Sequence, residues 1–367
     1  MLPKRIPRFV LFSLLLFAFG SAIAVFGAEQ TVTQKETGEY EKLAEGVYAR
    51  IARPDDESVV SNSGFVILDK SVLVFDTHYT PEAGQALLTK IRSITSKPVR
   101  FIVNSHYHAD HTHGNQVFPE SCQIIGTAAS RRDALQKDSA SLKRALNASQ
   151  EQIEKMKKEI SESTDSAAKA HATAQIRVRQ ELVEGLSRMK LLPPVIAVED
   201  RLIIRAGKWE VEVFSPGNGH TDGDLVLHLP AEKIVFAGDL FFNGTLPNTQ
   251  DANVLEWMKT LAKLAQLDAT SFVPGHGAIG KKSDVLAFLA YFEELKGMIE
   301  PAVSRGDTLD QVIRDTRVPG KYSGYRFQQF FSANVQRMYT ELKAQLPNPL
   351  PAAVPLDDAA TGEIEEK

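Results

Sequence analysis

The residues best suited to chemistry lie between Asn104 and Asn115, where four histidines and an aspartate occur within eight residues. In an extended chain His106 and His108 point to the same side, because side chains alternate with period two. Two imidazoles on one side can bind a single zinc ion. A bend after His108 would direct the next two polar residues, Asp110 and His111, toward a second position nearby. Nitrogen and oxygen ligands together suit zinc, with iron or manganese as alternatives.

This segment cannot complete the ligand shell of a metal alone, so further ligands must come from elsewhere in the chain. Three candidates each follow a predicted strand: His220 after Gly219, Asp239 after Gly238, and His276 between Gly275 and Gly277. Glycine beside each candidate allows the backbone to pack closely against a metal.

The order of these motifs, H-x-H-x-D-H followed by a single His, a single Asp and a single His, resembles that of the metallo-β-lactamase superfamily over roughly residues 40–280. The resemblance implies an αββα sandwich, with two mixed sheets back to back and helices outside. It also implies a division of the ligands: for one metal His106, His108 and His220; for the second Asp110, His111 and His276; and as a bridge between both metals Asp239.

Two zinc ions a few ångströms apart lower the pKa of a shared water toward neutrality, and the resulting hydroxide can attack a carbonyl carbon. Asp110 can bind metal, orient this nucleophile and handle its proton. Some β-lactamases of the superfamily have Cys, with a nearby Lys, where this chain has Asp239, and others have Ser. A bridging Asp is similar to glyoxalase II and lactonases instead, but the basic residues of glyoxalase II are not evident here.

We therefore predict a hydrolase with two zinc ions per chain, acting on a small molecule that carries a β-lactam, lactone, ester or thioester bond. A di-iron redox member of the superfamily is an alternative, since the ligand set alone does not exclude iron. A second alternative is a non-enzymatic binding protein that the metal only stabilises.

Four other residues are candidates for supporting or substrate-contacting roles. Asp76 follows the strand pair ending at Phe75 and matches an early aspartate of the superfamily, which implies that it braces the metal loop. His78 could line the site, and His113 could support the ligands or lie on the loop surface. Asn243 is a candidate donor that polarises a substrate carbonyl.

Strands and helices must position these residues. The sequence of the N-terminal half predicts strands at 46–51, 63–68, 71–75 and 99–103 and a helix at 81–94. The run 99–103 is continuously apolar, which is typical of a strand buried on both faces. Residues 127–190 have apolar residues at helical spacing and predict two or three amphipathic helices. This insertion is interpreted as a hairpin packed on the body, or alternatively as a lid or dimerisation arm through which a homo-oligomer forms.

The C-terminal half predicts further strands and two helical regions. The strands are expected at 195–198, 201–204, 209–214, 225–229, 234–237 and 271–273, with helical patterns at 253–266 and 283–346. The predicted organisation is a signal peptide (1–28), a metallo-β-lactamase-fold domain (29–280) containing the insertion (127–190), a helical extension (281–346) and a disordered tail (347–367).

The N-terminus and the composition restrict the location and the partners. Basic residues precede an apolar run from Phe9 to Val25, which is typical of a cleaved signal peptide and predicts export, with the bacterial periplasm as destination. No stable membrane span is expected after cleavage; an uncleaved membrane anchor is the alternative interpretation of the apolar run. The single cysteine, Cys122, excludes an intrachain disulfide and a four-cysteine zinc site, and it is expected in the core. A net charge of −4 gives no reason to expect nucleic acid as a partner.

Overall fold

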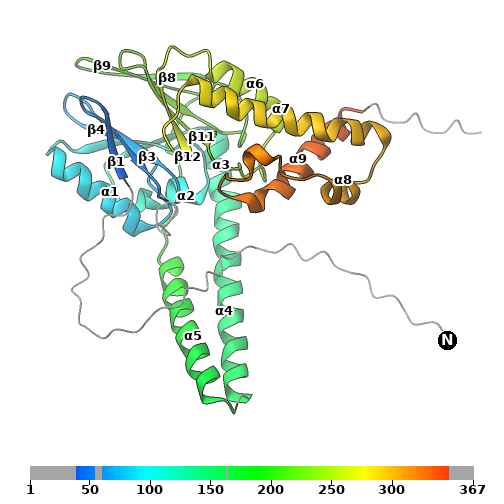
Figure 1. Ribbon diagram of the computed structural model, residues 1–367. Coiled ribbons are helices and arrows are strands. Elements are labelled where there is room, and N and C mark those ends of the chain that lie inside the picture. The colour runs from blue at the N-terminus through cyan, green and yellow to red at the C-terminus, as the bar shows by residue number, and fades with distance from the viewer. Residues whose placement is uncertain (1–38, 54–59, 163, 347–367) are drawn as a thin grey trace, which may run out of the picture. The chain divides into compact units, whose positions relative to one another are not determined.

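The computed structural model describes residues 39–53, 60–162 and 164–346, which belong to one compact unit spanning Thr37–Lys367. The predicted signal peptide and the predicted disordered tail lie outside the described residues. Two sheets pack face to face with helices on both outer faces, which confirms the predicted αββα sandwich (Figure 1). Among the described residues, no helix is both long and apolar enough to cross a membrane.

The first sheet contains seven strands in chain order. Its first four strands pair antiparallel and its last four pair parallel, so β4 belongs to both sets. The strands are β1 (Glu39–Ala44), β2 (Val47–Ile51), β3 (Ser63–Ile67), β4 (Val72–Phe75), β5 (Val99–Val103), β6 (Gln123–Gly126) and β7 (Ile196–Ala197).

Helix α1 (Pro81–Ile94) makes the crossover between the parallel strands β4 and β5. The Thr80 side chain accepts a hydrogen bond from Ala83 N, and proline stands in the first turn, so the helix begins where the sequence predicts. Its apolar face buries Leu87 and Ile91 against the outer face of the first sheet.

The second sheet contains five strands in the order β12-β11-β10-β9-β8. Only β11 and β12 pair parallel, and α6 (Val254–Leu264) connects them. The strands are β8 (Arg201–Ala206), β9 (Trp209–Phe214), β10 (Val226–Leu229), β11 (Ile234–Asn243) and β12 (Ser271–Gly277).

The outer face of the second sheet is covered by α6 and by the predicted C-terminal helices. These are α7 (Lys282–Arg305), α8 (Leu309–Asp315) and α9 (Phe331–Ala344), with short 3₁₀ turns at Gly320–Tyr322 and Gln328–Phe330. Gly306 ends α7 with φ 84°, a left-handed conformation that favours glycine.

Close contact between the two sheets forms the central core. Gly64 of β3 is required there, because a Cβ would lie only 2.2 Å from the ring of Phe236 on β11. The other side chains between the sheets are almost all aliphatic and include Val66, Leu73, Val211, Val213 and Leu227. Cys122 is buried on the outer side of the first sheet and its thiol donates to the Val99 carbonyl at 3.1 Å, which confirms its predicted place in the core.

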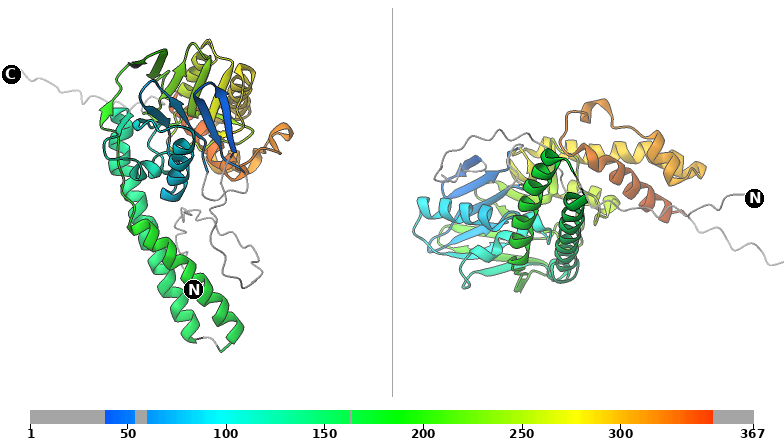
Figure 2. Two further views of the ribbon diagram at one scale, coloured as in Figure 1. Left: turned by 90° about the vertical axis from the view of Figure 1, so that its left-hand side faces the viewer. Right: turned by 90° about the horizontal axis from the view of Figure 1, so that it is seen from below.

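The insertion is helical, as predicted. It consists of α3 (Ala128–Asp133), a π-helical turn (Ala134–Asp138), α4 (Ser139–Glu162) and α5 (Ser166–Ser187). Figures 1 and 2 show α4 and α5 side by side, extending away from the sheets as a two-helix hairpin. Ile153 and Ile176 are buried, and most other described side chains of the hairpin are at least partly exposed.

Four elements differ from the sequence prediction. The sequence analysis missed β1 and β6. The strands predicted at 234–237 and 271–273 are longer than expected, so Asp239 and His276 lie within β11 and β12 and not on loops after them. Both strands continue past their glycines because the parallel pairing between them resumes after irregularities near Gly238.

Candidate metal centre

The first half of the centre is built at the carboxyl ends of β4 and β5, which are parallel neighbours and therefore end at the same edge of the sheet. Asp76 follows β4, and the histidine segment follows β5. The short helix α2 (Ala109–Thr112) supplies the predicted bend after His108 and turns Asp110 and His111 back toward the strand ends.

Asp76 holds this segment in place, as the resemblance implies. Its carboxylate accepts hydrogen bonds from Ser105 N at 2.8 Å and Ser105 Oγ at 2.7 Å, and its Oδ2 lies 2.8 Å from His111 Nδ1. The backbone of Asp76 has φ 58°, which is uncommon for a residue other than glycine. Asp76 therefore fixes the orientation of the His111 ring, with Nε2 left facing the centre.

One group of potential ligands contains His106, His108, His220 and Asp239, whose ligand atoms all lie within 4.8 Å of one another. His108 Nδ1 lies 2.9 Å from His220 Nε2, and His220 Nε2 lies 3.3 Å from Asp239 Oδ2. The rings of His106 and His108 are 4.6 Å apart, consistent with the prediction that they point to the same side.

The second group contains Asp110, His111 and His276. His276 Nε2 and His111 Nε2 lie 3.3 Å and 3.5 Å from Asp110 Oδ2. All seven residues predicted to bind metal are thus brought together. Their division into two groups is also the predicted one, while their role as ligands stays a prediction.

Asp239 contacts both groups. Its carboxylate lies 3.3 Å from His220 in the first group, and 3.1 Å and 3.3 Å from His111 and His276 in the second. Gly275, on the neighbouring strand, makes room for it, because a Cβ at that position would lie 1.8 Å from Asp239 Oδ1.

The polar atoms of the centre fit a cation. His106 Nε2, His111 Nε2 and Asp239 Oδ1 are buried and have no hydrogen-bond partner. Buried polar atoms without partners are costly. The two facing nitrogens of His108 and His220 cannot satisfy each other when both carry lone pairs. A bound metal would accept all of these lone pairs, and the mixture of imidazole and carboxylate suits zinc.

Electrostatics separate four histidines of the centre into two pairs. Burial lowers the pKa of His106 and His220, the latter to about 3, so these imidazoles are neutral and ready to bind metal. Burial also opposes charge on His111 and His276, but the carboxylates of Asp239 and Asp110 outweigh it and raise both pKa values, that of His276 to about 9. Metal binding would therefore displace protons from His111 and His276.

Asp251 is a supporting residue that the sequence analysis missed. Its Oδ2 lies 3.2 Å from His108 Nε2, and Tyr107 OH donates to the same oxygen at 2.7 Å. Lys137, from the base of the helical insertion, lies 3.2 Å from Asp251 Oδ1. A carboxylate on the far nitrogen of a ligand histidine fixes the tautomer and ring orientation. Asp251 stands in the loop after β11 with no motif around it, so no sequence signal marks it.

The remaining candidates lie at the border of the centre. His78 is buried with φ 72°, and its ring contacts the Ser63 hydroxyl at 2.8 Å and the Ser61 carbonyl at 3.1 Å. His113 Nε2 lies 3.1 Å from Asp138 of the insertion. Asn243 donates to the Ala278 carbonyl at 2.9 Å, so its amide is engaged in holding the chain after β12.

Aromatic side chains form one wall of the centre. The ring of Phe242 stacks on His276 at 5.1 Å, and Trp257 of α6 lies 5.5 Å from His220. Phe327, from the segment between α8 and α9, lies 5.6 Å from His276 with its ring at 84°. The centre is therefore apolar on the side of the second sheet.

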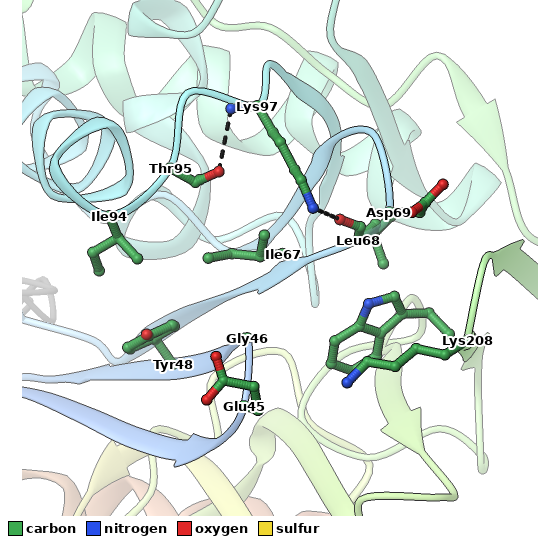
Figure 3. A pocket seen from close by; sticks show the side chains of 11 residues that line it. Glu45, Gly46, Tyr48, Ile67, Leu68, Asp69, Ile94, Thr95, Lys97 and Lys208 are labelled. Carbon is green, nitrogen blue, oxygen red and sulfur yellow. Dashed lines mark hydrogen bonds between the residues drawn. The ribbon is translucent and has the colours of Figure 1, made fainter.

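A separate cavity of about 360 Å³ lies near the turns that precede β4, β5 and β9, at the other edge of the sheets (Figure 3). Its two lysines are already engaged. Lys97 Nζ donates to the Leu68 carbonyl at 2.7 Å, and Lys208 lies over the Trp209 ring at 4.8 Å. Without converging unpaired groups, this cavity is not a candidate active site.

Comparison with known proteins agrees with this fold and this centre. A model of the metallo-beta-lactamase superfamily matches residues 57–276. The chain is 24% identical over 281 residues to a metallo-beta-lactamase type 2 of Bacillus cereus, with 73% of this chain and 90% of that protein covered.

Solved structures show the same fold. A metallo-beta-lactamase from Pontibacter korlensis matches with TM-score 0.52 and 21% identity, over 70% of this chain and 99% of that one. The metallo-beta-lactamase FIM-1 from Pseudomonas aeruginosa, in a mono-zinc form, matches with TM-score 0.51 and 19% identity, over 70% and 96%. The family model covers more than half of the chain, and its range includes all seven residues of the centre; the chain belongs to the metallo-beta-lactamase superfamily.

Proposed function

We propose that this protein is a dinuclear zinc hydrolase that cleaves the carbonyl-centred bond of a β-lactam, lactone, ester or thioester. The observation that carries the proposal is the position of Asp239, whose carboxylate lies within 3.3 Å of ligand atoms from both groups. A structural zinc needs four ligands and no more. Seven converging side chains with a shared carboxylate favour two ions and a catalytic role.

His106, His108 and His220 would hold one zinc, Asp110, His111 and His276 the other, and Asp239 would contact both. Bound zinc supplies an acidified water and polarises a carbonyl oxygen. Asp110 is the carboxylate that can reach the substrate, because its side chain is 23% exposed whereas that of Asp239 is only 4% exposed. Asp110 orients the attacking water and receives its proton.

The experiment is zinc content by mass spectrometry, combined with hydrolysis of nitrocefin, a lactone and a thioester. We expect two zinc ions per chain and turnover of at least one substrate, both reduced in His108→Ala. His171→Ala is the matched control, because His171 is exposed on α5 and contacts only Gln175 among the described residues. Two irons without hydrolysis would support the redox alternative. One structural metal without turnover would support the binding protein.

We also propose that the protein is exported, on the basis of the basic residues and apolar run at 1–28. Cell fractionation and N-terminal sequencing of the expressed full chain test this. Cytoplasmic protein that retains Met1 would contradict it.

A further inference from the structure

The pairing between β11 and β12 is irregular where β12 approaches His276. Gly238 pairs with Pro274, but the next pair along the ladder joins Phe242 to His276, so the two strands advance by different numbers of residues here. The carbonyls of β12 in this stretch therefore cannot rely on regular ladder partners. Pro274 and Gly275 are buried, so their carbonyls need hydrogen-bond donors from elsewhere in the protein.

Asn62, which stands just before β3, supplies these donors. Its side-chain amide donates from Nδ2 to the carbonyls of Pro274 and Gly277, both at 2.8 Å, and its backbone N donates to the Gly275 carbonyl at 2.7 Å. Its Oδ1 accepts a hydrogen bond from Ala52 N at 2.9 Å. Asn62 is only 2% exposed, so water cannot replace these bonds easily. One residue of the first sheet thus holds the backbone on both sides of His276.

The two residues before Asn62 contact the second ligand group directly. The Val60 carbonyl accepts a hydrogen bond from His276 Nδ1 at 3.0 Å, which leaves Nε2 of that ring free to bind metal. The Ser61 hydroxyl donates to the backbone carbonyl of Asp110. The segment 60–62 therefore joins the part of the second group that follows β5 to the part that lies on β12.

The first ligand group is held differently. Within the described part of the chain, no hydrogen bond links the segment 60–62 to His106, His108 or His220. His108 is oriented by Asp251 instead, at 3.2 Å. A change at Asn62 should therefore affect the two groups unequally.

We propose that Asn62 is a positioning residue for the second ligand group, acting through the backbone of β12 on the direction of the His276 ring. This inference rests on the proposed two-zinc centre and names a residue on which the second ion depends. Asn62→Asp preserves the size of the side chain but removes both amide donors and places a carboxylate against two carbonyl oxygens. The backbone around His276 must then move away.

The first test titrates zinc into the metal-free full chain against a chromophoric chelator that resolves two binding steps. Asn62→Asp is expected to weaken one step about 10- to 100-fold, as is typical when a supporting contact of a metal ligand is lost. The weakened step should be the one that His276→Ala abolishes. Should Asn62→Asp not fold, Asn62→Ala replaces it, because this variant also removes the amide but adds no buried charge.

Asn334→Asp is the matched control. Asn334 is also a fully buried asparagine, and its side chain bonds Tyr291 OH and Thr249 Oγ1, each at 2.9 Å, and none of the seven residues of the centre. This variant should leave both zinc-binding steps unchanged. Equal weakening of both steps in Asn62→Asp would show general destabilisation and overturn the inference, and so would two unchanged steps. Either result leaves the hydrolase proposal intact.

A second test needs no metal. Exchange of backbone amide hydrogens is measured by mass spectrometry on the metal-free full chain. In Asn62→Asp we expect exchange to become at least about tenfold faster in β12, with β9 and β10 of the same sheet unchanged, because only local opening is affected. Unchanged exchange in β12, or a uniform increase over all three strands, would overturn the inference. If the wild-type chain binds a single zinc, the two-zinc proposal fails, and this exchange measurement alone decides the role of Asn62.

Discussion

At the scale of the residue, the ligand histidines differ in what holds their second nitrogen. Asp76 holds His111, Asp251 holds His108, the Ser105 hydroxyl lies 2.9 Å from His106 Nδ1, and the Val60 carbonyl lies 3.0 Å from His276 Nδ1. The two carboxylates make the stronger contacts, because ionised acceptors give stronger hydrogen bonds than neutral ones. The buried Asp76 and the partly exposed Asp251 therefore contribute most to positioning.

Asp251→Ala is expected to weaken zinc binding about 10- to 100-fold, because the His108 ring loses its orienting carboxylate. Competition with a chromophoric chelator measures this affinity. Asp222→Ala is the control, since Asp222 is exposed and its carboxylate pairs with Arg132 and not with a histidine of the centre. Unchanged zinc affinity in Asp251→Ala would show that its contact with His108 does not support the metal.

Asp224 gives a pH dependence to stability. Burial raises the pKa of its carboxyl to about 7, although hydrogen bonds from Thr221 N and Oγ oppose the rise. The folded state therefore binds a proton more tightly than the unfolded state, whose Asp has a pKa of about 3.9. The stability of the protein should fall as pH rises from about 4 to about 7 and then level off.

Asp224→Asn removes this titration. In metal-free protein, its free energy of unfolding relative to wild type should increase across that pH interval by up to about 4 kcal/mol. Urea unfolding at a series of pH values measures the difference. If the free energies of unfolding of the two proteins change with pH in parallel, Asp224 is ionised throughout this pH interval.

The seven residues of the centre were predictable because each lies beside a recognisable signal. Four of the seven lie in one short segment after an apolar strand, and the other three stand beside glycines. Asp251 was not predictable, because its position depends on a contact across a long stretch of chain. It contacts His108, which is 143 residues away in the sequence. Only the folded arrangement shows this contact.

At the scale of the element, α1 and β5 begin and end at the predicted residues because apolar periodicity and capping agree there. β11 and β12 were predicted too short, since Gly238, Pro274 and Gly275 are typical of loops. In the structure these residues allow irregular pairing that brings two strands close around a carboxylate. Gly238 and Gly275 therefore do not end these strands. They lie within them and allow the irregular pairing around the carboxylate.

Gly275→Ala tests this close approach. The new Cβ would lie 1.8 Å from Asp239 Oδ1, so the carboxylate must move and zinc binding should weaken by at least tenfold. Gly297→Ala is the matched control: Gly297 is exposed in α7 and a Cβ there meets nothing within 4 Å. That variant should be more stable by about 0.5–1 kcal/mol and bind zinc normally. Normal zinc binding in Gly275→Ala would contradict the proposed tight fit.

At the scale of the whole molecule, the αββα sandwich and the hairpin of α4 and α5 meet at the base of the insertion. His113 contacts Asp138, and Asp251 contacts Lys137, so the π-helical turn is attached to the loops around the centre. The helices beyond the turn contact mainly each other. The predicted role of the insertion in forming a homo-oligomer stays a prediction.

Replacing residues 150–179 by a short glycine-rich turn should leave the zinc content unchanged, because none of the described side chains of this region contributes to the centre or to its supports. Metal analysis checks this. Light scattering on the same variant tests oligomerisation: a smaller assembly than wild type would assign the interface to the hairpin. Loss of zinc in a folded variant would show that the hairpin supports the centre at a distance.

The seven residues of the centre come from both sheets. His106, His108, Asp110 and His111 follow β5 of the first sheet. Asp239 and His276 lie in strands of the second sheet, and His220 lies in the loop between its strands β9 and β10. An ion held between them must lose partners on one side before it can leave. Exchange of isotopically labelled zinc would then proceed only as fast as the two sheets separate. The residence time of the ion would therefore measure how often this separation occurs.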